Sequence, residues 1–240
     1  MEKVERFSPV DGSHLKIIAM LTMLIDHVGY VLLPQHLFLR FIGRLAFPIY
    51  AFLLVEGLFF TRSRSRYLMR LCFFALISEI PFDIAFGKSR DFLYDCNVYY
   101  TLALGLASIW CIDVLIDMWQ NTEKNVFRKI IYPLILAAIV GFTTWIAYFI
   151  NTDYNAIGIM AIIMGYCIYK ANFPKFVVFA GIAFVLTAAV NIEAWAFCAL
   201  PFIYFYNGKR GISGRIFQYF CYIFYPAHLI ILFLIKTKFF

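Results

Sequence analysis

Apolar runs long enough to cross a lipid bilayer follow one another along nearly the whole chain. They fall at 15–33, 41–60, 67–86, 98–117, 130–150, 154–170, 175–190, 193–206 and 216–235, with short polar segments between them. A helix needs about 20 apolar residues to cross the hydrocarbon core, where every backbone polar group must be hydrogen bonded within the protein. The pattern predicts an all-α polytopic integral membrane protein with about nine transmembrane helices. Eight or ten spans are the alternatives, because 175–206 also fits one broken helix or a tight hairpin.

The composition agrees with a membrane protein and with a single transmembrane domain over 1–240. Of the 240 residues, 63% are hydrophobic and 15% are charged, whereas soluble domains are about 45–50% apolar and about 25% charged. The first residues, MEKVERFSPVDGSH, include acidic side chains and no cleavage-like motif. We therefore do not expect a secretory signal here, and the first span should remain in the mature protein.

The basic residues predict the orientation of the spans. With the N-terminus in the cytoplasm, nine spans place most of them on the cytoplasmic side: Lys3, Arg6, Arg62, Arg64, Arg66, Lys124, Arg128, Lys129, Lys170, Lys175, Lys209, Arg210 and Arg215. The opposite side keeps Arg40, Lys88 and Arg90, the last two offset by Asp91 and Asp95, and the C-terminal Lys236 and Lys238 are the exception. The positive-inside rule favours this orientation. Because topology explains most of the net charge of +7, we expect no nucleic-acid partner.

Three ionisable side chains lie too deep in the predicted spans to reach an interface. They are Asp26, His27 and His228, and a charged group at mid-bilayer costs about 2.5–3.5 kcal/mol. Lys16 and His27 are eleven residues apart, which places them within ~20° on one helix face and ~16 Å apart along the axis. Asp26 points ~100° away from His27, so we expect it to pair with another helix, Arg44 being the nearest basic candidate. His228 on the last span lies at about the depth of His27, so the two histidines either line one cavity or pack as simple hydrogen-bonding groups.

A basic run, TRSRSRYLMR, opens the third predicted span. Arg66 and Arg70 are four residues apart and therefore share a helix face. They lie near a helix N-terminus, which carries a partial positive charge, on the side where Lys16 also lies. A positive-inside loop explains such a run, but the combination also suits a phosphorylated ligand, since the arginine fork binds two phosphate oxygens at once.

Further carboxylates within the spans are open candidates. Glu79 and Asp83 lie four residues apart around Pro81, so like charges would repel and at least one should be neutralised or close to an interface. A structural pairing and an acid–base role are both compatible with that spacing. The role of Glu56 is open as well. No metal-ligand pattern appears, and we expect no metal.

Three segments resemble a known family: LKIIAMLTMLIDHVGYVLLP, FIGRLAFPIYAFLLVEGLFFTRSRSRYLMRLCFFALISEIPFDIAF and YIFYPAHLIILFLI are similar to the TraX family of integral membrane proteins, known for N-acetylating conjugative pilin. The TraX family in turn resembles the acyltransferase-three superfamily, whose first span carries a basic residue, ten intervening residues and a histidine. Lys16 and His27 match that spacing. Arg66 and Arg70 match its arginine-rich element with one residue more between them. The resemblance implies a multi-pass protein of the bacterial inner or plasma membrane that transfers an acyl group from cytoplasmic acyl-CoA.

The resulting hypothesis is a membrane acyltransferase, in the first place an acetyltransferase. Lys16, Arg66 and Arg70 would meet the phosphates of acetyl-CoA at the cytoplasmic mouth, and a passage would carry the thioester to His27. Neutral His27 would act as general base on an amine or hydroxyl acceptor, a role that suits its ordinary pKa of about 6.5. The acceptor is an unidentified protein, sugar or small molecule, at or across the membrane lipid.

The other site residues have supporting roles in this hypothesis. Asp26 or a group on a neighbouring helix would set the tautomer of His27, and Arg44 or His228 would stabilise the oxyanion or position the acceptor. A covalent acyl-histidine is a variant of the same mechanism. The alternative function is a proton-coupled transporter in which Asp26, His27, Glu79 and His228 form a proton path. An intramembrane protease is disfavoured, because no G-x-S-x-G or H-E-x-x-H sequence is present.

Overall fold

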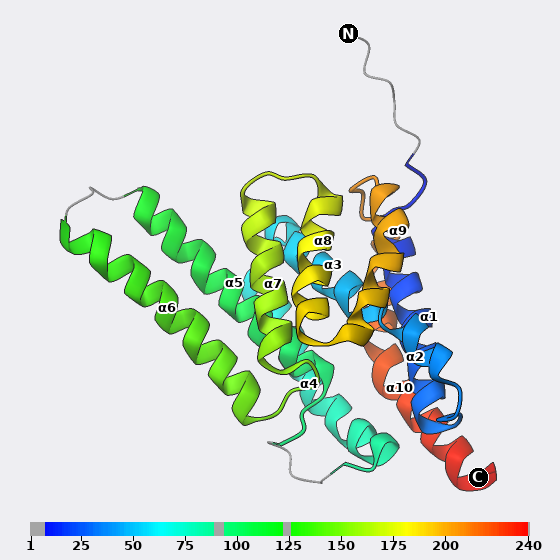
Figure 1. Cartoon of the computed structure of the whole chain (residues 1–240). Helices are drawn as coiled ribbons and strands as arrows, with labels where there is room; N and C mark the ends of the chain where they lie inside the picture. The colour runs from blue at the N-terminus through cyan, green and yellow to red at the C-terminus, as the bar shows by residue number, and fades with distance from the viewer. Residues whose placement is uncertain (1–7, 89–93, 122–125, 240) are drawn as a thin grey trace.

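The computed structural model describes residues 8–88, 94–121 and 126–239, and this part of the chain is helical almost throughout (Figure 1). Its elements are α1 (Gly12–Val31), α2 (Leu37–Gly43), α3 (Ala46–Phe60), α4 (Arg64–Phe86), α5 (Val98–Gln120), α6 (Val126–Phe149), α7 (Asn155–Lys170), α8 (Lys175–Ala189), the 3-10 helix η1 (Asn191–Ala199), α9 (Leu200–Tyr204) and α10 (Arg215–Phe239). The one β-type pairing among these residues is an isolated bridge between Val10 and Tyr206. The predicted all-α class is confirmed.

Every predicted span corresponds to a helical segment, but two of them are not continuous α-helices. The span at 41–60 breaks between α2 and α3, around Arg44 and Leu45. Pro48 follows in the first turn of α3. Because proline has no backbone N–H, it cannot make the hydrogen bond that would continue α2 into α3 as one helix. The span at 193–206 is η1 followed by the short α9. A 3-10 helix rises about 2.0 Å per residue, so η1 and α9 together advance about 25 Å, more than an α-helix of the same length.

Within the described residues, five helical segments are long and apolar enough to cross a membrane: Gly12–Val31, Leu37–Phe60, Val98–Gln120, Val126–Phe149 and Arg215–Phe239. α4 has 23 residues, but its apolar stretch includes Arg70, Glu79 and Asp83. α7 and α8 are apolar and shorter, with 16 and 15 residues. These features are those of a membrane protein.

The connections between helices alternate between the two ends of the bundle. Figure 1 shows the last turn of α5, the first turn of α6 and the α7–α8 connection at the end where α1 begins (the N-terminal end), and the α1–α2, α6–α7 and α8–η1 connections at the other end, where α10 ends. Ion pairs join elements at the N-terminal end, among them Arg64 with Asp113 at 2.7 Å, Lys170 with Asp113 at 2.6 Å and Lys175 with Glu56 at 3.0 Å. The connections that the charge pattern predicts to be cytoplasmic therefore gather at one end. Five charges used in that prediction lie outside the described residues: Lys3, Arg6, Arg90, Asp91 and Lys124.

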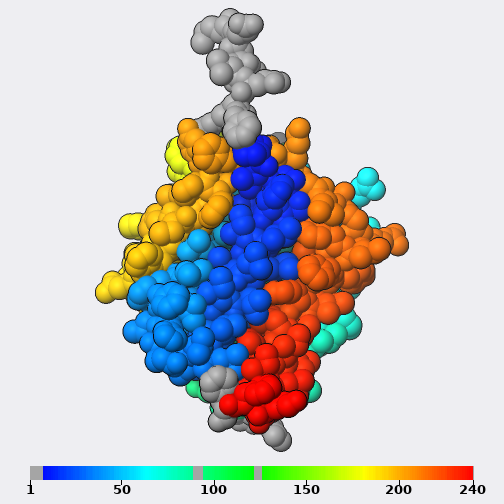
Figure 2. All heavy atoms as spheres, turned by 90° about the vertical axis from the view of Figure 1, so that its right-hand side faces the viewer, coloured from blue at the N-terminus to red at the C-terminus, as the bar shows by residue number. Residues whose placement is uncertain are grey.

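The first and last helices lie side by side. α10 packs against both α1 and α4, while α1 also contacts α2 and α3, and Figure 2 shows the blue surface of α1 next to the red surface of α10. α6 lies at the edge of the fold, against α5 and α7, and Ala147 is its only buried residue. In a membrane protein the exposed apolar side chains of α6 face lipid.

The centre of the bundle depends on close helix contacts at glycine. Gly158 of α7 faces α5 and α3: a Cβ there would lie 2.6 Å from Thr101 Cγ2, 2.7 Å from Tyr154 Cβ and 3.2 Å from Phe47 Cζ. Small residues permit such close packing between membrane helices, where van der Waals contact drives association. Gly141 of α6 is the opposite case, because nothing lies within 4 Å of its added Cβ.

Replacing these two glycines by alanine should have different effects on stability. Gly158→Ala forces α7 away from α5, and we expect a loss of about 1–3 kcal/mol, the usual cost of overpacking a filled core. Gly141→Ala adds a methyl group to open space on a helix and should leave stability unchanged or slightly higher. Thermal unfolding of the two purified variants in the same detergent measures the difference. Equal melting temperatures would contradict the packing described for α7.

Candidate functional site

Two cavities lie in opposite halves of the bundle. The first, which we name the histidine chamber, has a volume of about 380 Å³ and is lined by residues that include Met23, Asp26, His27, Arg40, Arg44, Lys88, Tyr154, Glu193 and Tyr225. The second, the basic vestibule, has a volume of about 430 Å³ and is lined by residues that include Gly12, Lys16, Glu56, Arg70, Tyr206, Arg210 and Cys221. The vestibule is at the N-terminal end of α1, and the chamber is at the end where α1 meets α2.

The two deep histidines contact each other. His27 Nδ1 lies 2.7 Å from His228 Nε2, and both side chains are buried. His228 Nδ1 lies in turn 2.7 Å from the carbonyl oxygen of Phe224, one turn earlier on α10. His27 lines the chamber and His228 lies behind it, on the side of α10. The prediction that these residues lie at the same depth is therefore correct.

The carbonyl at the end of this chain determines the direction of its hydrogen bonds. A carbonyl oxygen can only accept, so His228 Nδ1 must carry the proton that it donates to Phe224. When both rings are neutral, His228 Nε2 is then an acceptor and His27 Nδ1 donates to it. His27 Nε2 is left with its lone pair, and it makes no hydrogen bond within the described part of the chain. His27 is thus held in the tautomer that a general base needs.

Aromatic rings surround the histidine pair. Phe86 and Tyr225 contact the His27 ring edge to face, with centroid distances of 5.1 and 6.0 Å, and Phe224 stacks on His228 at 5.0 Å. These contacts restrict rotation of both imidazoles. The orientation of His27 is therefore fixed by packing as well as by its hydrogen bond.

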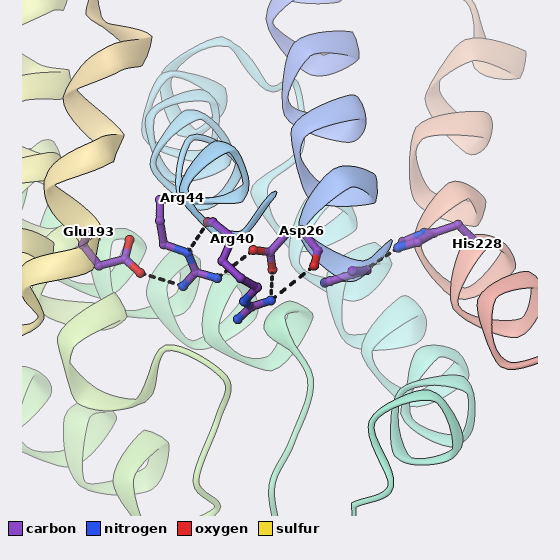
Figure 3. Close-up of polar contacts among 6 residues, drawn as sticks. Asp26, Arg40, Arg44, Glu193 and His228 are labelled. Carbon is purple, nitrogen blue, oxygen red and sulfur yellow. Dashed lines mark hydrogen bonds and ion pairs between the residues drawn. The ribbon is translucent and has the colours of Figure 1, made fainter. Parts of the chain in front are cut away.

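Asp26 belongs to a network of ion pairs beside the histidines (Figure 3). Its Oδ2 lies 2.6 Å from Arg40 Nη1 and its Oδ1 lies 3.0 Å from Arg44 Nη2. Arg44 Nη1 is 2.8 Å from Glu193 Oε1, so the network joins α1, α2 and η1. Two carboxylates and two guanidinium groups give it no net charge, which lowers the cost of burying it. The predicted pairing of Asp26 with Arg44 is present, whereas no hydrogen bond joins Asp26 to the His27 ring within the described residues.

By sequence, Arg40 falls in the predicted loop between the spans at 15–33 and 41–60, and nothing there indicates a role for Glu193. Arg40 lies four residues before Arg44, a spacing that puts both on one face of a helix, and this was the available signal. Gly43 lets α2 approach α1 closely enough for the network, because a Cβ at that position would overlap Asp26. Glu193 Oε2 is buried and accepts no hydrogen bond within the described residues.

The basic vestibule contains two of the three predicted phosphate ligands. Lys16 and Arg70 line it, whereas Arg66 is exposed to solvent and is not among the lining residues. Arg210, which the sequence analysis did not select, lines the vestibule from the segment between α9 and α10. That segment is held against α1 by the hydrogen bond from Gly12 N to the Lys209 carbonyl at 2.8 Å. Arg70 Nε is buried and donates no hydrogen bond within the described chain.

Two of the remaining candidate carboxylates, Glu56 and Glu79, contact other side chains of the protein. Glu56 lines the vestibule, where Tyr206 donates a hydrogen bond to it and Lys175 forms an ion pair with it. Glu79 is fully buried and accepts hydrogen bonds from the side chain and the backbone N–H of Asn97, the latter at 3.2 Å. Asp83 is buried one turn further on. Neither Glu79 nor Asp83 is among the residues that line the two cavities.

The comparisons with known proteins agree with the arrangement of the chain. The model of the TraX protein family matches residues 11–236. A relative from Dichelobacter nodosus, named "Probable fimbrial assembly protein FimC, serogroup H1", is 32% identical over 243 residues, covering 91% of this chain and 92% of the relative. The uncharacterized protein RP591 of Rickettsia prowazekii (strain Madrid E) is 25% identical over 152 residues, covering 63% of this chain and 53% of that protein. No solved structure gives a significant match. The family match covers almost the whole chain, so this protein belongs to the TraX family.

Proposed function

We propose that this TraX-family protein is a membrane-embedded acyltransferase, in the first place an acetyltransferase, that uses acyl-CoA as donor and an amine or hydroxyl as acceptor. The observation that carries the proposal is the oriented pair of His27 and His228 at the wall of a cavity. A neutral imidazole with one nitrogen tied to a neighbour and the other available is the usual form of a general base. The likeness of the Lys16 and His27 spacing to the acyltransferase-three superfamily is part of this proposal.

In the proposed reaction His27 Nε2 removes a proton from the acceptor nitrogen or oxygen as that atom attacks the thioester carbonyl. The carbon–sulfur bond then breaks, and the imidazolium returns the proton to the departing thiolate. The positive charge on His27 is delocalised toward His228 through the Nδ1–Nε2 hydrogen bond. This is the orienting role that a carboxylate has in a serine protease triad. We assign His228 this positioning role, and a covalent acyl-histidine remains a variant of the scheme.

Arg44 is suited to stabilise the oxyanion or to position the acceptor. It lines the chamber, and its Nε, Nη1 and Nη2 groups donate to the Arg40 carbonyl, Glu193 and Asp26. A guanidinium has five N–H donors, so two are available for the reacting carbonyl. Asp26 holds Arg44 in place, and its role in the proposal is therefore indirect.

The proposed donor site is the basic vestibule. The phosphates of acyl-CoA would contact Lys16, Arg70 and Arg210, three cations around one cavity. Because Lys16 and His27 are ~16 Å apart along α1, the extended pantetheine arm is long enough to bring a thioester from the vestibule toward the chamber. The residues present therefore fit acyl-CoA as a co-substrate.

The proposed topology has nine crossings of the bacterial inner or plasma membrane, with the N-terminus and the vestibule in the cytoplasm. It is supported by the connections that alternate between the two ends of the bundle and by the basic residues at the N-terminal end. The chamber would then open toward the opposite face. The Dichelobacter nodosus relative is named a fimbrial assembly protein, so a pilin subunit is the first acceptor to test, ahead of a sugar or a small molecule.

Loss of the base should remove acyl transfer. In membranes supplied with radiolabelled acetyl-CoA, we expect His27→Ala to lower the labelling of the acceptor by at least about 100-fold, the usual contribution of a general base. The matched control is His36→Ala, which removes an exposed histidine between α1 and α2 and should retain full transfer. Full transfer by His27→Ala would end the proposal. Substrate uptake by proteoliposomes without acyl-CoA would support a transporter instead.

The direction of the histidine hydrogen bonds can be tested at His228. His228→Ala removes the acceptor for His27 Nδ1, and we expect kcat to fall about tenfold or more, with a changed pH–rate profile. In His228→Gln the amide oxygen can accept the same hydrogen bond, so a substantial part of kcat should return. A merely structural role would lower the amount of folded protein without moving the pH profile of the protein that remains. Identical profiles for all three proteins would therefore refute the positioning role.

Binding of CoA should depend on its phosphates and on two vestibule residues. We expect Lys16→Ala and Arg70→Ala each to weaken CoA binding by about tenfold, a loss of about 1.4 kcal/mol. Arg66→Ala, whose side chain is exposed outside the cavity, should have a smaller effect. Isothermal titration of the detergent-purified protein with CoA and with 3′-dephospho-CoA measures this. Equal affinity for the two ligands would contradict a phosphate site at these residues.

A further inference from the structure

The chamber and the vestibule come together at one side chain. Tyr50 of α3 is the only described residue that lines both cavities. Its neighbours along α3, Ile49, Ala51 and Phe52, are fully buried in the core. The backbone that carries Tyr50 is therefore fixed, and its ring lies at the boundary between the two spaces.

Two further tyrosines, one in the wall of each cavity, contact each other. Tyr99 lines the vestibule and Tyr225 lines the chamber, and their rings meet edge to face at 5.2 Å. The Tyr99 hydroxyl donates to the carbonyl of Tyr222 at 3.1 Å. Tyr50 is only half-buried, whereas Tyr99 and Tyr225 are buried. Its hydroxyl makes no hydrogen bond with the described residues, so the Tyr50 ring, unlike that of Tyr99, can turn without breaking one.

We propose that Tyr50 is the specificity-determining residue of the donor site: its ring closes the passage from the basic vestibule to the histidine chamber and admits only short acyl groups. This inference rests on the proposed function. In this proposal a thioester bound at Lys16 and Arg70 passes the Tyr50 ring on its way to His27, because Tyr50 is the described residue that the two cavity walls share. When the Tyr50 ring turns, the passage opens. The space that the ring leaves then determines how large an acyl group can pass.

The ion-pair network in one part of the chamber wall favours the same class of donor. Beyond Tyr50, an acyl chain enters a space whose wall includes the Asp26, Arg40, Arg44 and Glu193 network. An apolar chain laid against these groups would displace water without replacing its hydrogen bonds, which is unfavourable. An acetyl group needs little room there, whereas each further methylene must fit between the ring and the network. Acetyl-CoA and other short-chain donors follow as the preferred class.

The first experiment tests the passage without any enzyme assay. Cys221 lines the vestibule and is partly exposed, so it reports which face of the membrane a water-soluble thiol reagent comes from. Inside-out and right-side-out vesicles are treated with a membrane-impermeant trimethylammonium methanethiosulfonate, and modified Cys221 is measured by peptide mass spectrometry. In the native protein we expect modification from one face only. In Tyr50→Ala we expect modification from both faces, with a rate from the second face at least about tenfold higher than in the native protein.

Two further variants control for the ring and for folding. Tyr50→Phe retains the ring and should behave as the native protein, while Tyr50→Val retains more packing than alanine and should give an intermediate rate from the second face. Reaction of Cys221 from the vestibule face in every variant shows that the vestibule is intact. Modification of native Cys221 at equal rates from both faces would overturn the closure by Tyr50. One-sided modification in both Tyr50→Ala and Tyr50→Val would overturn it as well.

The second experiment tests donor selection. Acyl transfer in membranes is compared for radiolabelled acetyl-CoA and hexanoyl-CoA, and in Tyr50→Ala we expect the ratio of hexanoyl to acetyl transfer to rise by about tenfold or more. That is within the range by which a pocket discriminates small changes in chain length. Tyr50→Phe should keep the native ratio. An unchanged ratio in Tyr50→Ala, together with transfer that depends on His27, overturns the inference and leaves the proposed function standing. Absence of transfer from any acyl-CoA by the native protein overturns the proposed function and the selection role together.

Discussion

Charges placed inside an apolar bundle must be paired, and this requirement organises one half of the molecule. Asp26 cannot stay unpaired at its depth in α1, and its partners are Arg40 and Arg44, which brings α2 against α1. Glu193 completes the network and holds η1 at the same place. His27, the next residue of α1, points ~100° away around the helix, to where α10 supplies His228. The ion pairs on one side and the histidine contact on the other are thus consequences of one helical register.

The sequence predicted most helices because hydrophobic length is a strong signal in a chain of this kind. It failed where the backbone departs from a regular α-helix. A 20-residue window cannot reveal the break at Arg44, since apolar residues continue on both sides of it. Likewise, η1 has the composition of a short apolar helix. A 3-10 helix rises more per residue than an α-helix, and only this geometry lets the 14 residues of η1 and α9 extend as far as the neighbouring helices.

The candidate site was predicted where it depends on helical geometry and missed where it depends on tertiary contacts. The spacing of Lys16 and His27 within one helix was sufficient to place them at two depths on one face. Arg210 could not be found in that way, because its position depends on the pairing of its segment with the chain before α1. Arg66 and Arg70 share a helix face in the sequence, yet burial separates them, and only Arg70 lies in the cavity wall.

The direction of the hydrogen bonds in the histidine pair determines which of the two cavities contains the base. Because the hydrogen-bond chain ends on the Phe224 carbonyl, the unprotonated nitrogen that accepts no hydrogen bond from the other ring is Nε2 of His27, which lines the chamber and not the vestibule. The cations Lys16, Arg70 and Arg210 lie on the other side of Tyr50. A phosphorylated donor therefore has its binding groups in one compartment and its base in the other. In such an arrangement the chemistry depends on how far the donor can extend through the boundary, so the aromatic side chain there is part of the site as much as the base itself.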